Sequence, residues 1–295
     1  IISYSSILSI IGLAIGSASI ILIGAFSQGF SNEVKKKLSS LDGHIRIEKY
    51  GSDQNSFMTQ NEFNEILGQL VPNPKIKSIH SFNQANGMFL NDNLSEGSIV
   101  FGVNESLIHE LTKNSKNINF NLQYFNDTTV ILGSELARNL NIEKGENVNL
   151  FNLNSMIKSQ GIKAVNVSVL GTIETGFLEY DKSLSFIPQN FLQTFFDQSE
   201  KLSGIIVNLS DHNSAEFVKS EIQDSLGRIP FMTSTWLDRH EMLFSWMNYF
   251  HQPLQLLMAF ISILAIFNIS SILWMMILEK SKNIAVLKTL GFRNN

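Results

Sequence analysis

Two long uncharged apolar runs lie near the ends of the chain, and a region of ordinary polar composition lies between them. No charged residue occurs from residue 1 to 32 or from residue 242 to 278. About 20 apolar residues in a helix, at 1.5 Å per residue, cross the hydrocarbon core of a bilayer. Both runs are long enough, so the pattern predicts two membrane-spanning helices that bracket a soluble domain.

The first apolar run is rich in small residues. Gly12 and Gly16 are four positions apart, and Gly24 follows two further turns along. Small residues at this spacing lie on one side of a helix and let a second helix approach closely. We therefore expect Gly12, Gly16 and Gly24 to form a packing face of the first membrane helix.

An amphipathic segment follows the first run. Phe30, Val34, Leu38 and Leu41 recur at helical spacing and form an apolar stripe. Gly43 is suited to the position just beyond a helix C-terminus, where a left-handed backbone conformation is common. The pattern predicts that the first helix continues past the bilayer as a stalk to about Leu41.

The second candidate span covers residues 253–278. Pro253 suits the first position of a helix, because its missing N–H has no partner there anyway. Aromatic side chains near the ends of a span favour the membrane interface. They are Trp246, Tyr249 and Trp274. The preceding segment, 236–250, is predicted to form a second stalk that leads into this span.

The central region alternates strand-like and helix-like segments. Its first part reads as strand, helix, strand, strand, and its last part as strand, helix, strand. Thr59 is the expected N-cap of the first helix, with Glu62 three residues on. The segments are 44–50, 59–70, 78–90 and 97–103, then 203–210, 213–226 and 229–236. We predict that the two parts fold together as a split α/β sandwich.

The stretch between these parts has more strand character. Residues 129–153 read as strand, short helix, a turn at 144–146 and a second strand. Residues 162–188 read as two strands around a polar corner at 179–182. These patterns predict a β-rich subdomain inserted into the first one.

Charge is distributed as unevenly as hydropathy. Residues 33–241 hold 25 of the 26 acidic residues and 18 of the 22 Lys and Arg, so this region is acidic, which argues against a nucleic-acid partner. The remaining four cations lie beyond residue 279. Positive flanks favour the cytoplasmic side, so we expect both chain ends there and the central region outside. The cations at 35–37 oppose this weakly, because the rule loses force for long translocated loops.

No pattern in the sequence indicates catalysis. There is no cysteine, no phosphate-binding glycine loop, no nucleophile elbow and no His pair at helical spacing. The "DRHE" run at 238–241 is interpreted as a solvated charge cluster. Glu174, Glu179 and Asp181 could form an acidic group, but a polar hairpin turn is the favoured interpretation. We expect neither a metal nor a cofactor in this chain.

The basic tail follows the second span immediately. "SKNIAVLKTLG" is predicted to form a short helix that Ser281 caps and Gly291 ends. Ile284, Leu287 and Leu290 then share one face. The helix is either an ordinary juxtamembrane helix on anionic lipid or a docking helix for a cytoplasmic partner.

Four segments together resemble ABC transporter permeases of the MacB/FtsX superfamily, most closely the lipoprotein-releasing LolC/LolE permeases. The tail "EKSKNIAVLKTLGF" resembles their E-[RK]-x₂-E-I-A-[IV]-L-[KR]-[AT]-[LM]-G segment, with Asn283 in place of the common Glu. "LGSELARNLNIEKGENVNL" and "GTIETGFLEYDKSLSFIP" resemble two signatures of the external domain. "SIIGLAIGSASIILIGAFSQGFSNEVKKKL" resembles the first helix and its stalk. The similarity covers most of the chain.

The resemblance implies a membrane α-helical fold with an inserted α/β (α+β) periplasmic domain, in a multi-pass protein of the bacterial inner membrane. The implied parts are the first transmembrane helix and stalk, a porter-like split βαβ subdomain in two pieces, a β-rich sabre-like subdomain, the second stalk and transmembrane helix, and a cytoplasmic coupling segment. In this sequence they cover 1–42, 43–104 with 201–240, 105–200, 241–279 and 280–295. The chain would stop before two further helices.

The resemblance also implies a function and partners. The permease would couple ATP hydrolysis by a separate ABC ATPase subunit, which would hold ATP and Mg²⁺, to movement of the periplasmic domain. It would pair with a second permease copy or a paralogue and release lipoproteins from membrane lipid to a periplasmic carrier. The residues implied for ATPase coupling are Ile284, Leu287, Lys288, Leu290 and Gly291. The residues implied for the carrier-binding loop, which is short here, are Asn154, Met156, Ile157 and Ile162.

Two other functions stay open at this point. A macrolide or peptide efflux permease of the MacB type would share the architecture and differ in its cargo. A two-span membrane sensor or chemoreceptor would also place an external domain between two spans. A sensor would need a heptad-bearing linker with a Pro after the second span, and the 17 residues from 279 onward show neither.

Overall fold

A computed structural model describes residues 4–51, 57–126, 128–157, 161–227 and 230–289. The chain divides into two compact units. One consists of Ile1–Glu33 with Glu241–Asn295, and the other of Val34–His240. The first is helical and the second is built on a mixed β-sheet, as predicted.

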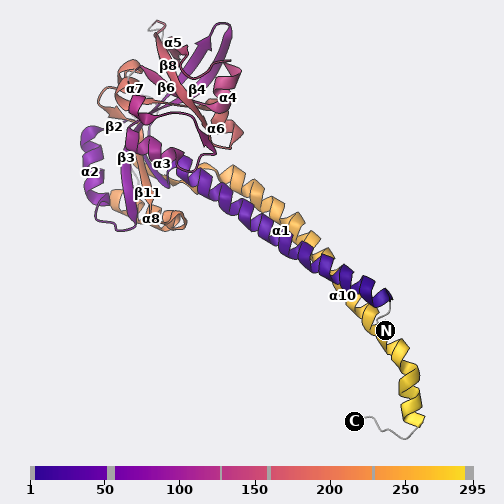
Figure 1. The fold of residues 1–295 in the computed structure, drawn as a ribbon. Helices are drawn as coiled ribbons and strands as arrows, with labels where there is room; N and C mark the ends of the chain where they lie inside the picture. Colours follow the sequence, from indigo (N-terminus) through magenta and orange to yellow (C-terminus); the bar gives the residue numbers. More distant parts are fainter. Residues whose placement is uncertain (1–3, 52–56, 127, 158–160, 228–229, 290–295) are drawn as a thin grey trace. The chain divides into compact units, whose positions relative to one another are not determined.

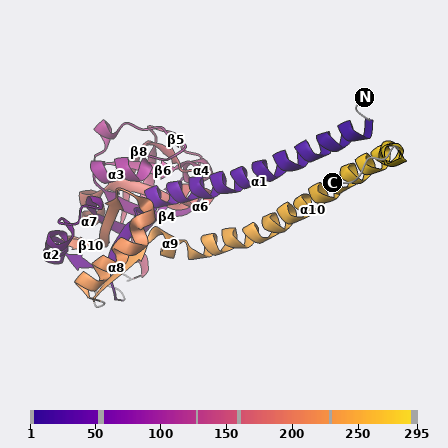
Figure 2. The ribbon, with the colours of Figure 1, turned by 90° about the horizontal axis from the view of Figure 1, so that it is seen from below.

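The helical unit is formed by α1 (Tyr4–Asp42) and α10 (Glu241–Thr289), each a single unbroken helix (Figure 2). Segments of both, Ile10–Asp42 and Glu241–Ser281, are long and apolar enough to cross a membrane. The two helices pair in antiparallel fashion. A Cβ built on Gly12 would lie 2.7 Å from Asn268 Nδ2, and one on Gly16 would lie 3.9 Å from Ile261 Cγ2.

Two predicted helix boundaries are wrong. Pro253 lies inside α10 and not at its start, because the helix begins at Glu241. A proline removes one backbone donor from the helix interior, a loss that membrane helices tolerate when neighbouring groups compensate. The tail does not begin a new helix at Ser281 either. Its hydroxyl donates to the carbonyl of Leu278, 2.7 Å away, and α10 continues to Thr289.

The predicted extent of the first helix is confirmed, and its role as a stalk outside the bilayer stays a prediction. α1 runs to Asp42, and Gly43 follows with φ of +73°, the left-handed conformation that ends a helix. Leu38 and Leu41 of the predicted stripe are buried in the second unit. The end of α1 is therefore packed into the domain.

The first half of the sheet has the strand order β12-β1-β11-β3, with every neighbouring pair antiparallel. Helices α2 and α8 contact each other and the strands (Figure 1). Thr59 and Glu62 form the predicted capping box at the start of α2. The bounds are β1 (Ile45–Lys49), α2 (Gln60–Leu70), β3 (Ile76–Asn91), β11 (Gly204–Leu209), α8 (Ala215–Leu226) and β12 (Phe231–Thr235). This is the split βαβ arrangement that the sequence predicted.

The second half of the sheet continues from β3, which changes its neighbour along its length. Its first part pairs with β11 as far as Phe82, and from Gly87 the same edge pairs with β7. The order then runs β3-β4-β9-β6-β8-β5. The bounds are β4 (Leu94–Val103), β5 (Asn117–Ile118), β6 (Thr129–Gly133), β7 (Asn147–Asn152), β8 (Ala164–Glu174) and β9 (Leu184–Pro188). β4, which the sequence placed in the first subdomain, pairs with strands of this half. The division at residues 104 and 200 stays a prediction.

The predicted hairpin around residues 179–182 is wrong. A short helix, α6 (Leu178–Ser183), joins β8 to β9, and these strands pair with other neighbours. β9 lies parallel to β4 and antiparallel to β6. A tight hairpin would have placed β8 and β9 side by side, so the connection had to be longer than a turn.

Several short elements were not predicted. They are β2 (Met58–Thr59), α3 (Glu105–Thr112), α5 (Leu153–Ile157), α7 (Gln189–Phe195) and β10 (Lys201–Leu202). The short helix predicted within residues 129–153 is α4 (Ser134–Asn139). The predicted second stalk begins as α9 (Trp236–Arg239), and His240 interrupts it before α10 begins. Two apolar clusters fill the second half of the domain. One is centred on Phe89 and Leu150, and the other on Phe82, Phe101 and Phe186.

Candidate functional site

The side chain of Asp42, the last residue of α1, accepts hydrogen bonds from three cationic or titratable side chains. Arg46 Nη2 lies 2.8 Å from Oδ1, while Arg239 Nε and His240 Nε2 lie 3.1 and 2.8 Å from Oδ2. Tyr180 reaches the same place, with its hydroxyl 3.0 Å from His240 Nε2. We name Asp42, Arg46, Tyr180, Arg239 and His240 the root cluster. It joins the end of α1 to the residues just before α10.

The local sequence explains why these side chains meet. Gly43 ends α1, so Asp42 faces the strand that follows. On the other side, Thr235 and Asp238 form a capping box that starts α9. His240 has φ of −117° and separates α9 from α10. The break leaves Arg239 and His240 pointing at the carboxylate of Asp42.

Arg46 is the most buried charge of the cluster, with 2% of its side chain exposed. Its guanidinium lies 5.0 Å from the ring centroid of Phe82 and 5.5 Å from that of Phe101. Nε donates to the backbone carbonyl of Asp42 at 2.9 Å, while Nη1 has no hydrogen-bond partner among the described residues. Burial lowers the pKa of Arg46, and the charge of Asp42 opposes that shift.

Asp42 stays ionised although it is only 4% exposed. Burial by itself would raise the pKa of the carboxyl group. The charge of Arg46, the hydrogen bond from His240 and the charge of Arg239 together outweigh burial and hold the pKa well below its usual range. Asp42 is therefore a fixed negative charge where the end of α1 meets the residues that precede α10.

Tyr180 brings the second half of the sheet to this cluster. It lies on α6, and its ring centroid is 6.0 Å from that of His240. Burial, followed by the nearby charge of Asp42, raises the pKa of its hydroxyl, so Tyr180 is neutral. Because an ionised carboxylate can only accept, the His240 Nε2 atom carries the hydrogen that Asp42 and Tyr180 share.

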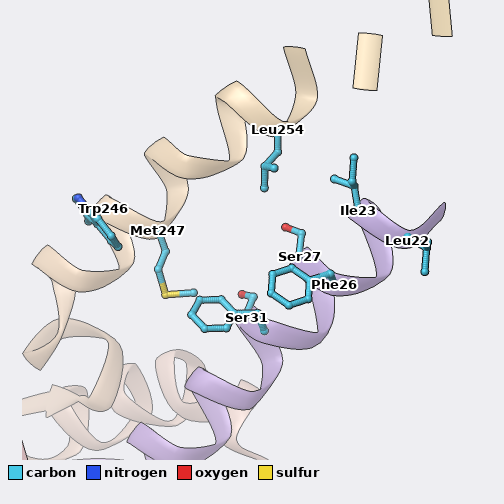
Figure 3. A pocket seen from close by; sticks show the side chains of 9 residues that line it. Leu22, Ile23, Phe26, Ser27, Ser31, Trp246, Met247 and Leu254 are labelled. Carbon is cyan, nitrogen blue, oxygen red and sulfur yellow. The ribbon is translucent and has the colours of Figure 1, made fainter. Parts of the chain in front are cut away.

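The helical unit contains an apolar groove between α1 and α10 (Figure 3). Its volume is about 620 Å³. The residues that line it are Leu22, Ile23, Phe26, Ser27, Phe30, Ser31, Trp246, Met247 and Leu254. Phe26 and Phe30 stack one helical turn apart, with centroids 6.3 Å apart. In each span, the lining residues lie in the part that is nearer in sequence to residues 34–240. The lining is suited to alkyl chains.

The residues predicted for carrier binding do not gather into one described site. Asn154, on α5, lines a polar pocket of about 300 Å³ together with Gln84, Asn86 and Gln198. Ile162 is 68% exposed. Met156 and Ile157 belong to α5, but their side chains lie outside the described part of the chain.

The residues predicted for ATPase coupling are described only in part. Ile284, Leu287 and Lys288 belong to the last turns of α10, and their side chains lie outside the described residues, as do Leu290 and Gly291 altogether. Of the predicted packing glycines, Gly12 and Gly16 face α10. A Cβ on Gly24 would meet no described heavy atom within 4 Å.

One interpretation of charged residues needs correction, and one disfavoured alternative does not apply. The "DRHE" run is not simply solvated, because Arg239 and His240 belong to the root cluster. The acids around residue 180 do not form a group either. Asp181 is buried and accepts from the Thr175 backbone and hydroxyl, while Glu174 pairs with Lys116. Within the described residues no three His, Asp or Glu side chains could hold a metal ion.

No sequence pattern pointed directly to the root cluster. Asp42 and Arg46 are four residues apart, but a helix end lies between them, so helical spacing does not apply. The available signals were a lone acid at the end of an amphipathic stripe and a Tyr within the motif that resembles the family signature. Neither signal identifies the side chains that these residues contact, because His240 lies 198 residues from Asp42 and 60 residues from Tyr180 in the chain.

Residues 6–225 match the family model of the MacB-like periplasmic core domain. The chain therefore belongs to this family, and it is an ABC transporter permease of the MacB/FtsX superfamily. The lipoprotein-releasing system transmembrane protein LolC of Xylella fastidiosa (strain Temecula1) is 22% identical over 98% of this chain and 69% of its own length. The corresponding LolE of Haemophilus influenzae is 23% identical over 97% of this chain and 69% of its own length.

Solved structures of two external domains are also similar. The periplasmic region of MacB from Actinobacillus actinomycetemcomitans has a TM-score of 0.44 and 12% identity, covering 70% of this chain and 95% of its own. The extracellular domain of the YknZ transporter from Gram-positive bacteria has a TM-score of 0.42 and 15% identity, covering 65% and 99%.

Proposed function

We propose that this permease transmits mechanical work from a cytoplasmic ATPase subunit to the domain at residues 34–240. The root cluster is the observation that carries this proposal. The last residue of α1 supplies one buried carboxylate, and the two residues before α10 bind it. A change in the helices at the membrane would therefore reach the domain at the root cluster, where α1 ends and the residues before α10 bind Asp42.

The proposed cargo is a lipid-anchored protein, which the permease would release from the inner membrane to a periplasmic carrier. The curated relatives named lipoprotein-releasing proteins support this choice. The apolar groove of α1 and α10 has a lining that an acyl chain would fit. Efflux of a macrolide or peptide is the alternative outcome.

In the proposed assembly the chain hydrolyses no ATP itself. A partner ATPase with ATP and Mg²⁺ would bind the end of α10, where Ile284 and Leu287 are three positions apart and share a face. A second permease copy or paralogue would complete the membrane part, and the full permease would be a multi-pass inner-membrane protein. Gly12 and Gly16 would keep α1 close to α10.

Cargo release is tested with the full-length permease and its ATPase in proteoliposomes that contain an acylated protein and a soluble carrier. Phe26→Ser makes the groove polar, whereas Ile21→Ser changes an equally exposed residue of α1 that does not line it. We expect release to fall about tenfold in the first variant and to stay near wild type in the second. Equal release from both variants, or ATP-dependent export of a drug in place of the acylated protein, contradicts the proposal.

ATPase coupling is tested by co-purification and ATP turnover. Leu287→Asp places a charge on the predicted docking face, and Ala285→Asp places the same charge on roughly the opposite side of the helix. The first variant should lose the ATPase, and the second should retain it. If both variants bind the ATPase and hydrolyse ATP as wild type does, the end of α10 is not the docking site.

A further inference from the structure

Tyr180 lies in the "GFLEYD" motif, and the proposed function does not explain why this motif contains a tyrosine. The segment is held in place by Asp181, whose Oδ1 accepts from the Thr175 backbone N–H at 2.7 Å and from the Thr175 hydroxyl at 2.8 Å. The Gly176 N–H also donates to Asp181 Oδ2, at 3.3 Å. α6 is therefore tied firmly to the end of β8.

The segment around Asp181 also packs closely against β6. A Cβ built on Gly133, at the end of β6, would lie 2.3 Å from the carbonyl oxygen of Asp181, so a larger residue would not fit. Tyr180 itself packs against the apolar cluster of Phe101 and Phe186. Because α6 is bonded to the end of β8 and packs closely against β6, Tyr180 is placed to connect the root cluster with the second half of the sheet.

On its other side, Tyr180 contacts the residue that directly precedes α10. The His240 Nε2 hydrogen is shared between Asp42 Oδ2 at 2.8 Å and the Tyr180 oxygen at 3.0 Å. One hydrogen cannot point straight at two acceptors, so the two acceptors compete for it and each bond weakens as its angle bends. If His240 moves relative to Asp42, the balance between the two bonds changes. Tyr180 then either moves with His240 or loses its hydrogen bond to His240.

We propose that Tyr180 is the positioning residue that carries displacement of the two helix ends into the second half of the sheet, through its hydroxyl bond to His240. This inference rests on the proposed function and adds the route inside the domain. Arg46 and Asp42 connect the helix ends to β1 in the first half. Tyr180 is the described member of the root cluster that belongs to the second half.

The experiment uses the full-length permease with its ATPase in proteoliposomes. The chain contains no cysteine, so Asp224→Cys on α8 and Asn139→Cys on α4 provide two exposed sites for spin labels. The distance between the labels reports movement of the second half against the first. Tyr180→Phe removes only the hydroxyl, and Tyr124→Phe removes an exposed hydroxyl in the same half as a matched control.

We expect wild type and Tyr124→Phe to show an ATP-dependent change in the label distance. Tyr180→Phe should lose most of this change and release cargo about tenfold more slowly, while ATP turnover stays within about twofold of wild type. His240→Asn removes the same contact together with the bond to Asp42, so it should lose at least as much of the change in label distance. If both variants give this result, a folding defect in one variant alone cannot explain it.

The outcomes separate the two proposals. If wild type changes its label distance with ATP and Tyr180→Phe does so equally, the route through Tyr180 is wrong and the proposed function stands. If Tyr180→Phe lowers ATP turnover and release in the same proportion, the residue is merely structural. If wild type itself shows no ATP-dependent change, mechanical transmission fails and the role of Tyr180 fails with it.

Discussion

The Asp42→Asn substitution tests whether the root cluster is held together by charge. Asn has nearly the same volume as Asp and keeps one of its two acceptor oxygens, so packing is little changed. The substitution removes the negative charge that faces Arg46 and Arg239. Arg46, with 2% of its side chain exposed, would then be a buried charge without a counter-ion.

The size of the effect follows from that burial. Removing one partner of a buried ion pair costs about 3–5 kcal/mol, because the remaining charge is not compensated. Arg239 contributes less, since its side chain is 28% exposed and water screens it. The substituted amide keeps some hydrogen bonding, so we expect the lower end, about 3 kcal/mol. With a urea slope of about 2–3 kcal/mol per M, the unfolding midpoint falls by roughly 1 M.

The assay is pulse proteolysis of the chain in detergent at increasing urea concentration. Asp197→Asn is the control, because it removes an acid whose ion pair with Lys163 is about half exposed. It should lower the free energy of unfolding by no more than about 1 kcal/mol. The folded-state pKa of Asp42 lies below its unfolded value, so its stabilisation is complete above about pH 4 and is lost as pH falls further. The difference between wild type and Asp42→Asn should therefore be about the same at pH 7 as at pH 5.

Arg46→Met provides the decisive comparison. In that background no buried cation remains at position 46, so Asp42→Asn should cost far less than in the wild type. If Asp42→Asn costs the same in both backgrounds, or no more than Asp197→Asn does in the wild type, the argument from buried charge is refuted.

Three further results are expected. Gly12→Leu should weaken pairing of α1 with α10, and Gly24→Leu should not, as measured by cross-linking of introduced cysteines in the two helices. Gly171→Ala should destabilise the domain by several kcal/mol, because the new Cβ would lie 1.9 Å from the carbonyl oxygen of Asn119; an unchanged urea midpoint would contradict this. Burial, with a smaller contribution from a neighbouring His, lowers the pKa of His44 to about 4. The free energy of unfolding should therefore fall by about 2 kcal/mol as the pH falls from about 7.5 to 5, because the unfolded chain binds a proton that folded His44 does not. His44→Asn should remove that dependence.

Much of the architecture could be predicted from the sequence because it depends on local periodicity. The two apolar runs determined α1 and α10, and the stripe ending at Leu41 located the end of the stalk within one residue. The split βαβ unit followed from alternation and from the capping box at Thr59. These features depend on neighbours a few residues apart, so the sequence contains all the information they need.

Features that depend on distant partners could not be predicted in this way. The sequence suggested a hairpin around residue 180, but strand pairing between β9 and β4 required a helix there. The helix start assigned to Pro253 was wrong because continuity of α10 outweighs the local preference of proline.

The amino-acid sequence by itself determined the candidate spans, the extent of the first helix and the class of external domain. Each of these follows from a pattern of residues within one segment. Only the tertiary structure decided that Asp42, Tyr180 and His240 meet, because the chain must fold across 198 residues to bring them together. The physical reason is burial. An ionised carboxylate that is 4% exposed is stable only where three-dimensional packing supplies its donors, and no local pattern specifies which side chains those will be.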